Sequence, residues 1–105
     1  MGLLSNLFGS EEPDFLFSDA PSTACFTCKH VVQEGRPVLH VTHDADDGSW
    51  QFLCGGDHTE EDAMILSLEQ MVKIDPSLNG LHEMPLGIGA FRESTNGEWK
   101  PFKAG

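Results

Sequence analysis

The sequence predicts a small α+β domain in which a short antiparallel sheet carries helices on one face. Runs of β-branched and aromatic residues separated by turn signals occupy the middle and the end of the chain. Between them lies a stretch whose apolar residues recur at helical spacing. The chain has 105 residues, which suits one hydrophobic core and is too short for two.

Residues 1–23 are predicted to form an arm ahead of a single domain that spans residues 24–105. The arm carries two apolar patches, one within residues 3–8 and one at residues 15–17. Large apolar side chains left in water promote association. We therefore expect the arm to dock on the domain or on a second copy of the chain, which would give a homodimer, and an arm that stays loose is the alternative.

A three-stranded meander is predicted at the start of the domain, with strands over residues 24–32, 37–43 and 49–54. Turn-forming residues separate the first two strands, and an Asp- and Gly-rich loop at residues 44–48 separates the second from the third. Side chains alternate between the two faces of such strands, so Trp50, Phe52 and Cys54 should share one face.

The main helix is predicted to begin at Thr59, a suitable N-cap, with Asp62 placed three positions later to reach back. It ends at Asp75-Pro76, where a shorter helix begins and continues to about Glu83. Its apolar stripe consists of Met64, Ile65, Leu68, Met71 and Val72.

A C-terminal hairpin is predicted from two strands at residues 88–93 and 99–102. Asn96-Gly97 lies between them and is a strong signal for a tight turn. Meander and hairpin together would build the sheet, with one main and one short helix on the same face.

Acidic residues dominate the charge. Six Lys and Arg face 17 Asp and Glu, which gives a net charge of −11, and no Lys or Arg occurs from residue 37 to residue 72. Such a surface repels nucleic acid and anionic membranes, whereas it attracts a basic protein. We therefore expect a non-enzymatic module that binds a basic protein partner. The alternative is an acidic surface that only keeps the protein soluble.

The expected interface combines the loop near residue 44 with the start of the main helix. Trp50 beside the loop would serve as an aromatic anchor within a charged rim, and packing in the core is the alternative for this side chain. The expected interface residues are Asp44, Asp46, Asp47, Trp50, Asp57, Glu60, Glu61 and Asp62.

Cys25, Cys28, Cys54 and His58 have the residue types of a tetrahedral zinc site. In the predicted meander, however, Cys25 and Cys54 would lie on the order of 20 Å apart. We therefore expect buried cysteines that act as small hydrophobes, without a cofactor. A zinc-stabilised protein is the alternative, and it requires a knuckle at residues 24–30 in place of a strand.

A cysteine-dependent enzyme is the least favoured interpretation, because nearby carboxylates stabilise the thiol over the reactive thiolate. We assign no catalytic residue. Three cysteines do not make a disulfide framework, and the sequence contains neither a secretory signal nor a run of about 20 apolar residues. The cytoplasm is the expected location.

Four groups of short motifs, taken in order, resemble an uncharacterised bacterial domain that is grouped with the immunity proteins of polymorphic toxin systems. The resemblance covers about residues 24–102 and implies a non-enzymatic protein that binds and neutralises a toxin. Gly56-Asp57 matches the acidic position of the pattern only approximately, and the opening cysteine pair is not part of it. The motifs are Cys28-Lys-His-Val-Val-Gln-Glu-Gly35, Asp47-Gly-Ser-Trp50-Gln-Phe52 with Cys54-Gly-Gly56, Ile74-Asp-Pro-Ser-Leu78, and Met84-Pro-Leu-Gly87 with Phe91-Arg92.

Overall fold

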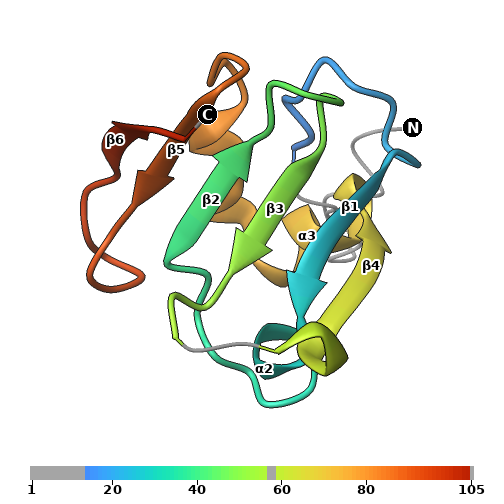
Figure 1. The fold of residues 1–105 in the computed structure, drawn as a ribbon, viewed down its shortest axis with the longest axis vertical. Helices are drawn as coiled ribbons and strands as arrows, with labels where there is room; N and C mark the ends of the chain where they lie inside the picture. The colour runs from blue at the N-terminus through green and yellow to red at the C-terminus, as the bar shows by residue number, and fades with distance from the viewer. Residues whose placement is uncertain (1–13, 57–58, 105) are drawn as a thin grey trace, which may run out of the picture.

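The computed structural model describes residues 14–56 and 59–104 (Figure 1). In this part of the chain, six strands form one sheet in the order β4-β1-β3-β2-β5-β6. The strands are β1 (Ala24–Cys28), β2 (His40–His43), β3 (Trp50–Leu53), β4 (Ala63–Ser67), β5 (Ile88–Phe91) and β6 (Lys100–Lys103). The helices are α2 (Lys29–Val32), α3 (Leu68–Ile74) and the 3₁₀ helices η1 (Glu60–Asp62) and η2 (Pro76–Leu81). The predicted α+β class is confirmed.

The sheet is mixed, whereas the sequence predicted an antiparallel one. β1 pairs with β3 in parallel, with Phe26 opposite Gln51 and Thr27 opposite Phe52. β2 pairs with β3 and β5, so the predicted meander is wrong in its order. Because parallel neighbours run in the same direction, the C-terminal ends of β1 and β3 lie side by side at one end of the sheet.

The first predicted strand ends earlier than expected. Lys29–Val32 form the short helix α2, in which the Gln33 N–H bonds to the Lys29 carbonyl at 2.7 Å. Gly35, with φ of 71°, adopts the left-handed conformation that only glycine takes without strain after a helix. The chain therefore leaves the sheet after Cys28 instead of continuing along it. Val31 of α2 is buried in the core.

The predicted main helix is wrong in its first half. Ala63–Ser67 form the edge strand β4, antiparallel to β1, and α3 begins only afterwards. Ser67 and Gln70 make a capping box: the Gln70 N–H bonds to Ser67 Oγ at 3.1 Å, and the Ser67 N–H bonds to Gln70 Oε1 at 2.9 Å. Asp62 does accept from the Thr59 N–H, at 3.0 Å, but this bond closes the turn of η1.

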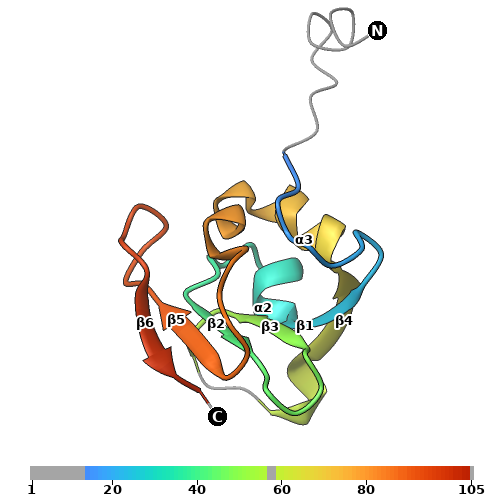
Figure 2. The same ribbon diagram turned by 90° about the horizontal axis from the view of Figure 1, so that it is seen from above.

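Helices α2, α3 and η2 lie on one side of the sheet and leave the other side open (Figure 2). We call these sides the covered face and the open face. On the covered face, Trp50 and Phe52 of β3 pack with residues of α3 and η2 in one hydrophobic core. Its largest fully buried side chains include Trp50, Phe52, Leu68, Met71 and Leu78.

The described part of the arm packs against this core. Phe17 is buried and meets the Trp50 ring edge-on, with centroids 4.9 Å apart. The Asn79 side chain holds the backbone on both sides of Phe15, because Oδ1 accepts from the Leu16 N–H and Nδ2 donates to the Asp14 carbonyl. The first apolar patch of the arm lies outside the described residues, and a homodimer through the arm stays a prediction.

Arg92 follows β5 and ties this strand to the start of η2. Its guanidinium is buried and pairs with Asp75 at 2.7 Å, while Nε donates to the Val38 carbonyl at 3.0 Å. The same group lies 4.2 Å from the centre of the Trp99 ring. The predicted hairpin is present, with β5 and β6 antiparallel.

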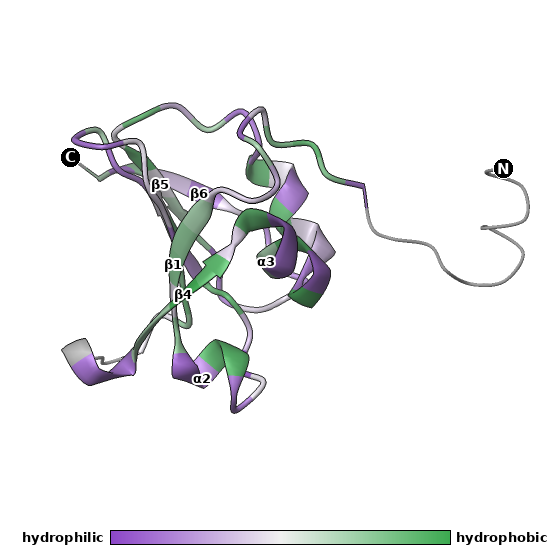
Figure 3. Cartoon of the chain, turned by 90° about the vertical axis from the view of Figure 1, so that its right-hand side faces the viewer, coloured by the Kyte–Doolittle hydropathy of each residue, from purple (hydrophilic) through white to green (hydrophobic). Residues whose placement is uncertain are grey.

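The two edges of the sheet differ in chemistry. The β6 edge carries Lys100, Pro101 and Lys103, which discourage pairing with another strand. The β4 edge carries no charge in its five residues and is the apolar strand nearest the viewer in Figure 3. None of the helices in the described ranges has the length and apolar character needed to cross a membrane.

Candidate functional site

The open face has an apolar centre. Phe26 of β1 is 40% exposed and Ile65 of β4 is 63% exposed, although both are large hydrophobic side chains. Beside them lies a hollow of about 290 Å³, whose walls include Phe26, Gln51, Leu53, Thr59, Asp62 and Ala63. Exposed apolar groups that gather around a hollow are typical of an interaction surface.

The carboxylates predicted to form one interface lie in two groups. Asp44, Asp46 and Asp47 are in the loop between β2 and β3, whereas Glu61 and Asp62 belong to η1, beside α2 (Figure 1). Strand β3 runs from the first group to the second, so the groups occupy opposite ends of the sheet. The expected single patch is therefore corrected to two acidic rims. Asp57 lies outside the described residues.

Local bonds hold several of these carboxylates in their charged form. Asp47 Oδ1 accepts from the Ser49 N–H at 2.9 Å, and this bond lowers the pKa of Asp47. The Thr59 N–H, and then the Lys29 ammonium at 3.2 Å, lower the pKa of Asp62. Lys29 also offsets part of the negative charge at this end of the sheet.

Trp50 does not form part of an accessible surface, so its expected role as an anchor is corrected. The side chain is 1% exposed and lies on the covered face, because positions 50 and 52 of β3 both point into the core. Its ring stacks on His43 at 3.9 Å between centroids. Among the described buried side-chain N and O atoms, only its Nε1 has no hydrogen-bond partner.

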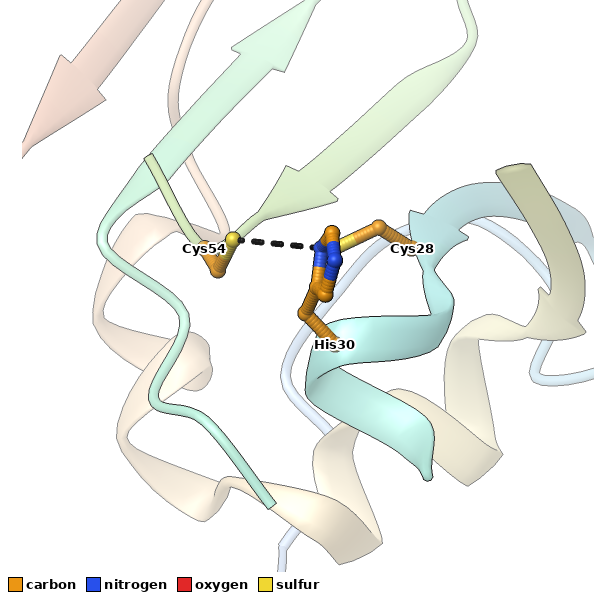
Figure 4. A group of neighbouring side chains, drawn as sticks. All are labelled: Cys28, His30 and Cys54. Atoms are coloured by element: carbon orange, nitrogen blue, oxygen red, sulfur yellow. Dashed lines mark hydrogen bonds between the residues drawn. The ribbon is translucent and has the colours of Figure 1, made fainter. Parts of the chain in front are cut away.

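A second feature, a group of cysteine and histidine side chains, lies at the end of the sheet where β1 and β3 terminate. Cys28 is the last residue of β1 and immediately precedes α2, His30 is in the first turn of α2, and Cys54 comes just after β3 (Figure 4). The ligand atoms of the three residues lie within 4.8 Å of one another. Cys54 Sγ is 3.8 Å from His30 Nδ1.

This Cys28–His30–Cys54 cluster differs from the set that the sequence suggested. Cys28 and Cys54 are neighbours, because β1 and β3 are parallel and not separated in a meander. Cys25 is buried three residues earlier and is not in the cluster, and His58 lies outside the described residues. His30 was weighed beside Cys28 or Cys54 only as a catalytic partner and was missed as a metal ligand, since its approach to Cys28 requires the unpredicted turn of α2.

The two buried cysteines of β1 have different surroundings. Burial raises the pKa of Cys25 to about 12. Burial also raises the pKa of Cys28, but backbone N–H groups of Val31 and Cys54 bond to its sulfur and act in the opposite direction. None of the three cysteines forms a disulfide. A raised thiol pKa disfavours a nucleophilic cysteine near neutral pH.

His40 adds no positive charge to the open face near neutral pH. Burial lowers the pKa of its imidazole, and the ring lies against Phe102 with centroids 5.1 Å apart. The surface between the acidic rims is therefore apolar and uncharged at its centre.

Comparisons with protein-family models, with curated proteins and with solved structures found no significant match.

Proposed function

We propose that this chain is a non-enzymatic binding module that docks a basic protein partner across the open face of its sheet. The observation that carries the proposal is the arrangement of an apolar centre between two acidic rims. Interfaces commonly combine a desolvated apolar centre with a polar rim, and opposite charges on the rims speed association.

The hollow beside Phe26 suits a cationic side chain of the partner. Lys and Arg have long aliphatic stems that pack on apolar surface while the charged head reaches a polar group. Phe26 and Leu53 would contact the stem, and Asp62 at the wall of the hollow would bind the head.

The resemblance to immunity proteins suggests the class of partner to test first, a basic toxin of a polymorphic toxin system. An acidic protein that neutralises a basic nuclease would present carboxylates where the nuclease binds phosphates. In this chain the loop at residues 44–47 and the η1 turn would supply them.

The test uses the purified chain as immobilised bait and measures binding of a basic toxin domain by surface plasmon resonance. Phe26→Ser should weaken binding by at least about tenfold if Phe26 is a central contact. The matched control is Ile74→Ser, because Ile74 is also an exposed apolar residue but lies in α3 behind the covered face.

A second pair of variants tests the charge. Asp62→Asn should slow association and reduce its dependence on salt, while Glu83→Gln, at an exposed position next to η2, should leave both unchanged. Equal effects of Phe26→Ser and Ile74→Ser, or an association rate that does not respond to salt, would contradict the proposal.

A further inference from the structure

The Cys28–His30–Cys54 cluster has a geometry that goes beyond a binding surface for proteins. Tetrahedral zinc has Zn–S distances of about 2.3 Å and Zn–N distances of about 2.0 Å, so its sulfur and nitrogen ligands lie about 3.6 Å apart. The 3.8 Å between Cys54 Sγ and His30 Nδ1 is close to this value. All three ligand atoms lie within 4.8 Å of one another. A small shift of one side chain would bring them to the distances of ligands on one zinc ion.

We propose that Cys28, His30 and Cys54 bind a zinc ion through two thiolates and one imidazole. Soft sulfur ligands with imidazole favour zinc over magnesium, calcium or manganese, which prefer oxygen. Binding displaces one proton from each thiol, so the two thiolates balance the charge of the ion. A fourth ligand from outside these three residues would complete the tetrahedron.

The surroundings of the cluster fit bound thiolates. The Val31 and Cys54 N–H groups bond to the Cys28 sulfur, and such bonds stabilise a metal-bound thiolate. Cys28 and Cys54 are both buried, which shields the thiolates from bulk water.

Zinc at this place would link three separate elements. The ligands come from the end of β1, from α2 and from the segment after β3. A helix of four residues is not stable without tertiary contacts. Zinc coordination would therefore stabilise α2 most, because it fixes this helix to the ends of β1 and β3. Zinc binding to the folded chain therefore raises the melting temperature.

The first experiment adds cobalt(II), and then zinc, to the metal-free reduced full-length chain. We expect one equivalent of cobalt to produce sulfur-to-metal charge-transfer absorption, which zinc abolishes by displacement. X-ray absorption of the zinc form should give two sulfur neighbours at about 2.3 Å. Absence of the cobalt band, or a count of three sulfurs, would overturn the proposal.

Matched variants assign the ligands. Cys28→Ala and Cys54→Ala should each weaken zinc binding by more than the roughly 10–100-fold expected for changes outside the ligand shell. Cys25→Ala is the control for a buried cysteine, and His82→Asn is the control for His30→Asn. A loss of affinity in Cys25→Ala as large as in Cys28→Ala would reject the cluster. If the ligand variants fail to fold, the sulfur count on the unmodified chain decides.

Discussion

The two faces of the sheet present the same residue types to opposite surroundings. On the covered face, Phe52 is fully buried against the core, whereas Phe26 on the neighbouring strand is 40% exposed on the open face. Phe26 lies in β1 and Phe52 lies in β3, and these two strands are paired with each other. Alternation along a strand therefore sets which residues share a face, whereas the packing of α3 and η2 determines which face is buried in the core.

Truncation of both phenylalanines tests this difference between the two faces. Phe52→Ala should destabilise the fold by about 3–5 kcal/mol, because it removes a fully buried ring and leaves a cavity. Phe26→Ala should lower the free energy of unfolding by only about 1 kcal/mol, since much of its ring already contacts water. Urea denaturation measures both values, and equal losses would contradict the assignment of the faces.

Arg92 tests how the covered face is held at its end. Arg92→Ala should destabilise the fold by about 3 kcal/mol, because it removes the ion-pair partner of Asp75 and the side-chain donor to the Val38 carbonyl. The control is Arg36→Ala, which removes an exposed ion pair with Glu34 and should change stability by less than about 1 kcal/mol. Similar thermal midpoints for the two variants would count against a structural role for Arg92.

On the covered face, the indole N–H of Trp50 is buried without a hydrogen-bond partner among the described residues. Trp50→Phe removes an indole N–H that lacks a partner, and this relief offsets part of the lost packing. We expect a net change in unfolding free energy of no more than about 1 kcal/mol, far less than for Phe52→Ala. Guanidinium denaturation of both variants makes the comparison, and a loss as large as that of Phe52→Ala would show that the N–H has a partner in solution.

The smallest effect concerns acid at the rim of the open face. The pKa of Asp62 is lowered, so the folded chain binds fewer protons there than the unfolded chain does. The resulting stabilisation is present above about pH 4 and disappears as the pH falls through the lower, folded-state pKa. Hydrogen exchange of the Thr59 amide should therefore accelerate on acidification relative to Asp62→Asn, which loses the effect at every pH. Asp46→Asn, in the other rim, should behave like the unmodified chain.

The predicted fold class, the hairpin and the short helix at Asp75-Pro76 depended on local signals, and the structure contains all three. Asn96-Gly97, however, does not form a two-residue turn, because it lies within the longer connection 92–99 between β5 and β6. The split of the predicted helix was not anticipated, because a short apolar run such as residues 63–67 fits both a strand and a helix. The signal that separates them is the spacing of Ser67 and Gln70, which form the capping box. That pair places the start of the helix at residue 68.

The candidate sites were harder to predict, because both depend on pairing between distant segments. The cysteine cluster requires β1 beside β3 in parallel, and no turn signal encodes that choice. The acidic residues were predicted to form one patch, and their separation into two rims follows from the length of β3 between them. Trp50 lies next to the acidic loop in sequence and still points into the core, since alternation along the strand decides its direction.

The position of β1 between β3 and β4 has a consequence for synthesis of the chain. Both partners of β1 are made after it, and β4 ends only at Ser67, 39 residues beyond Cys28. At about 5–20 residues per second, ribosomal elongation leaves this strand without its full set of neighbours for about 2–8 s. Strand β1 therefore lacks its second neighbour until β4 is complete, and β2 waits longer still, because its neighbour β5 ends only at Phe91.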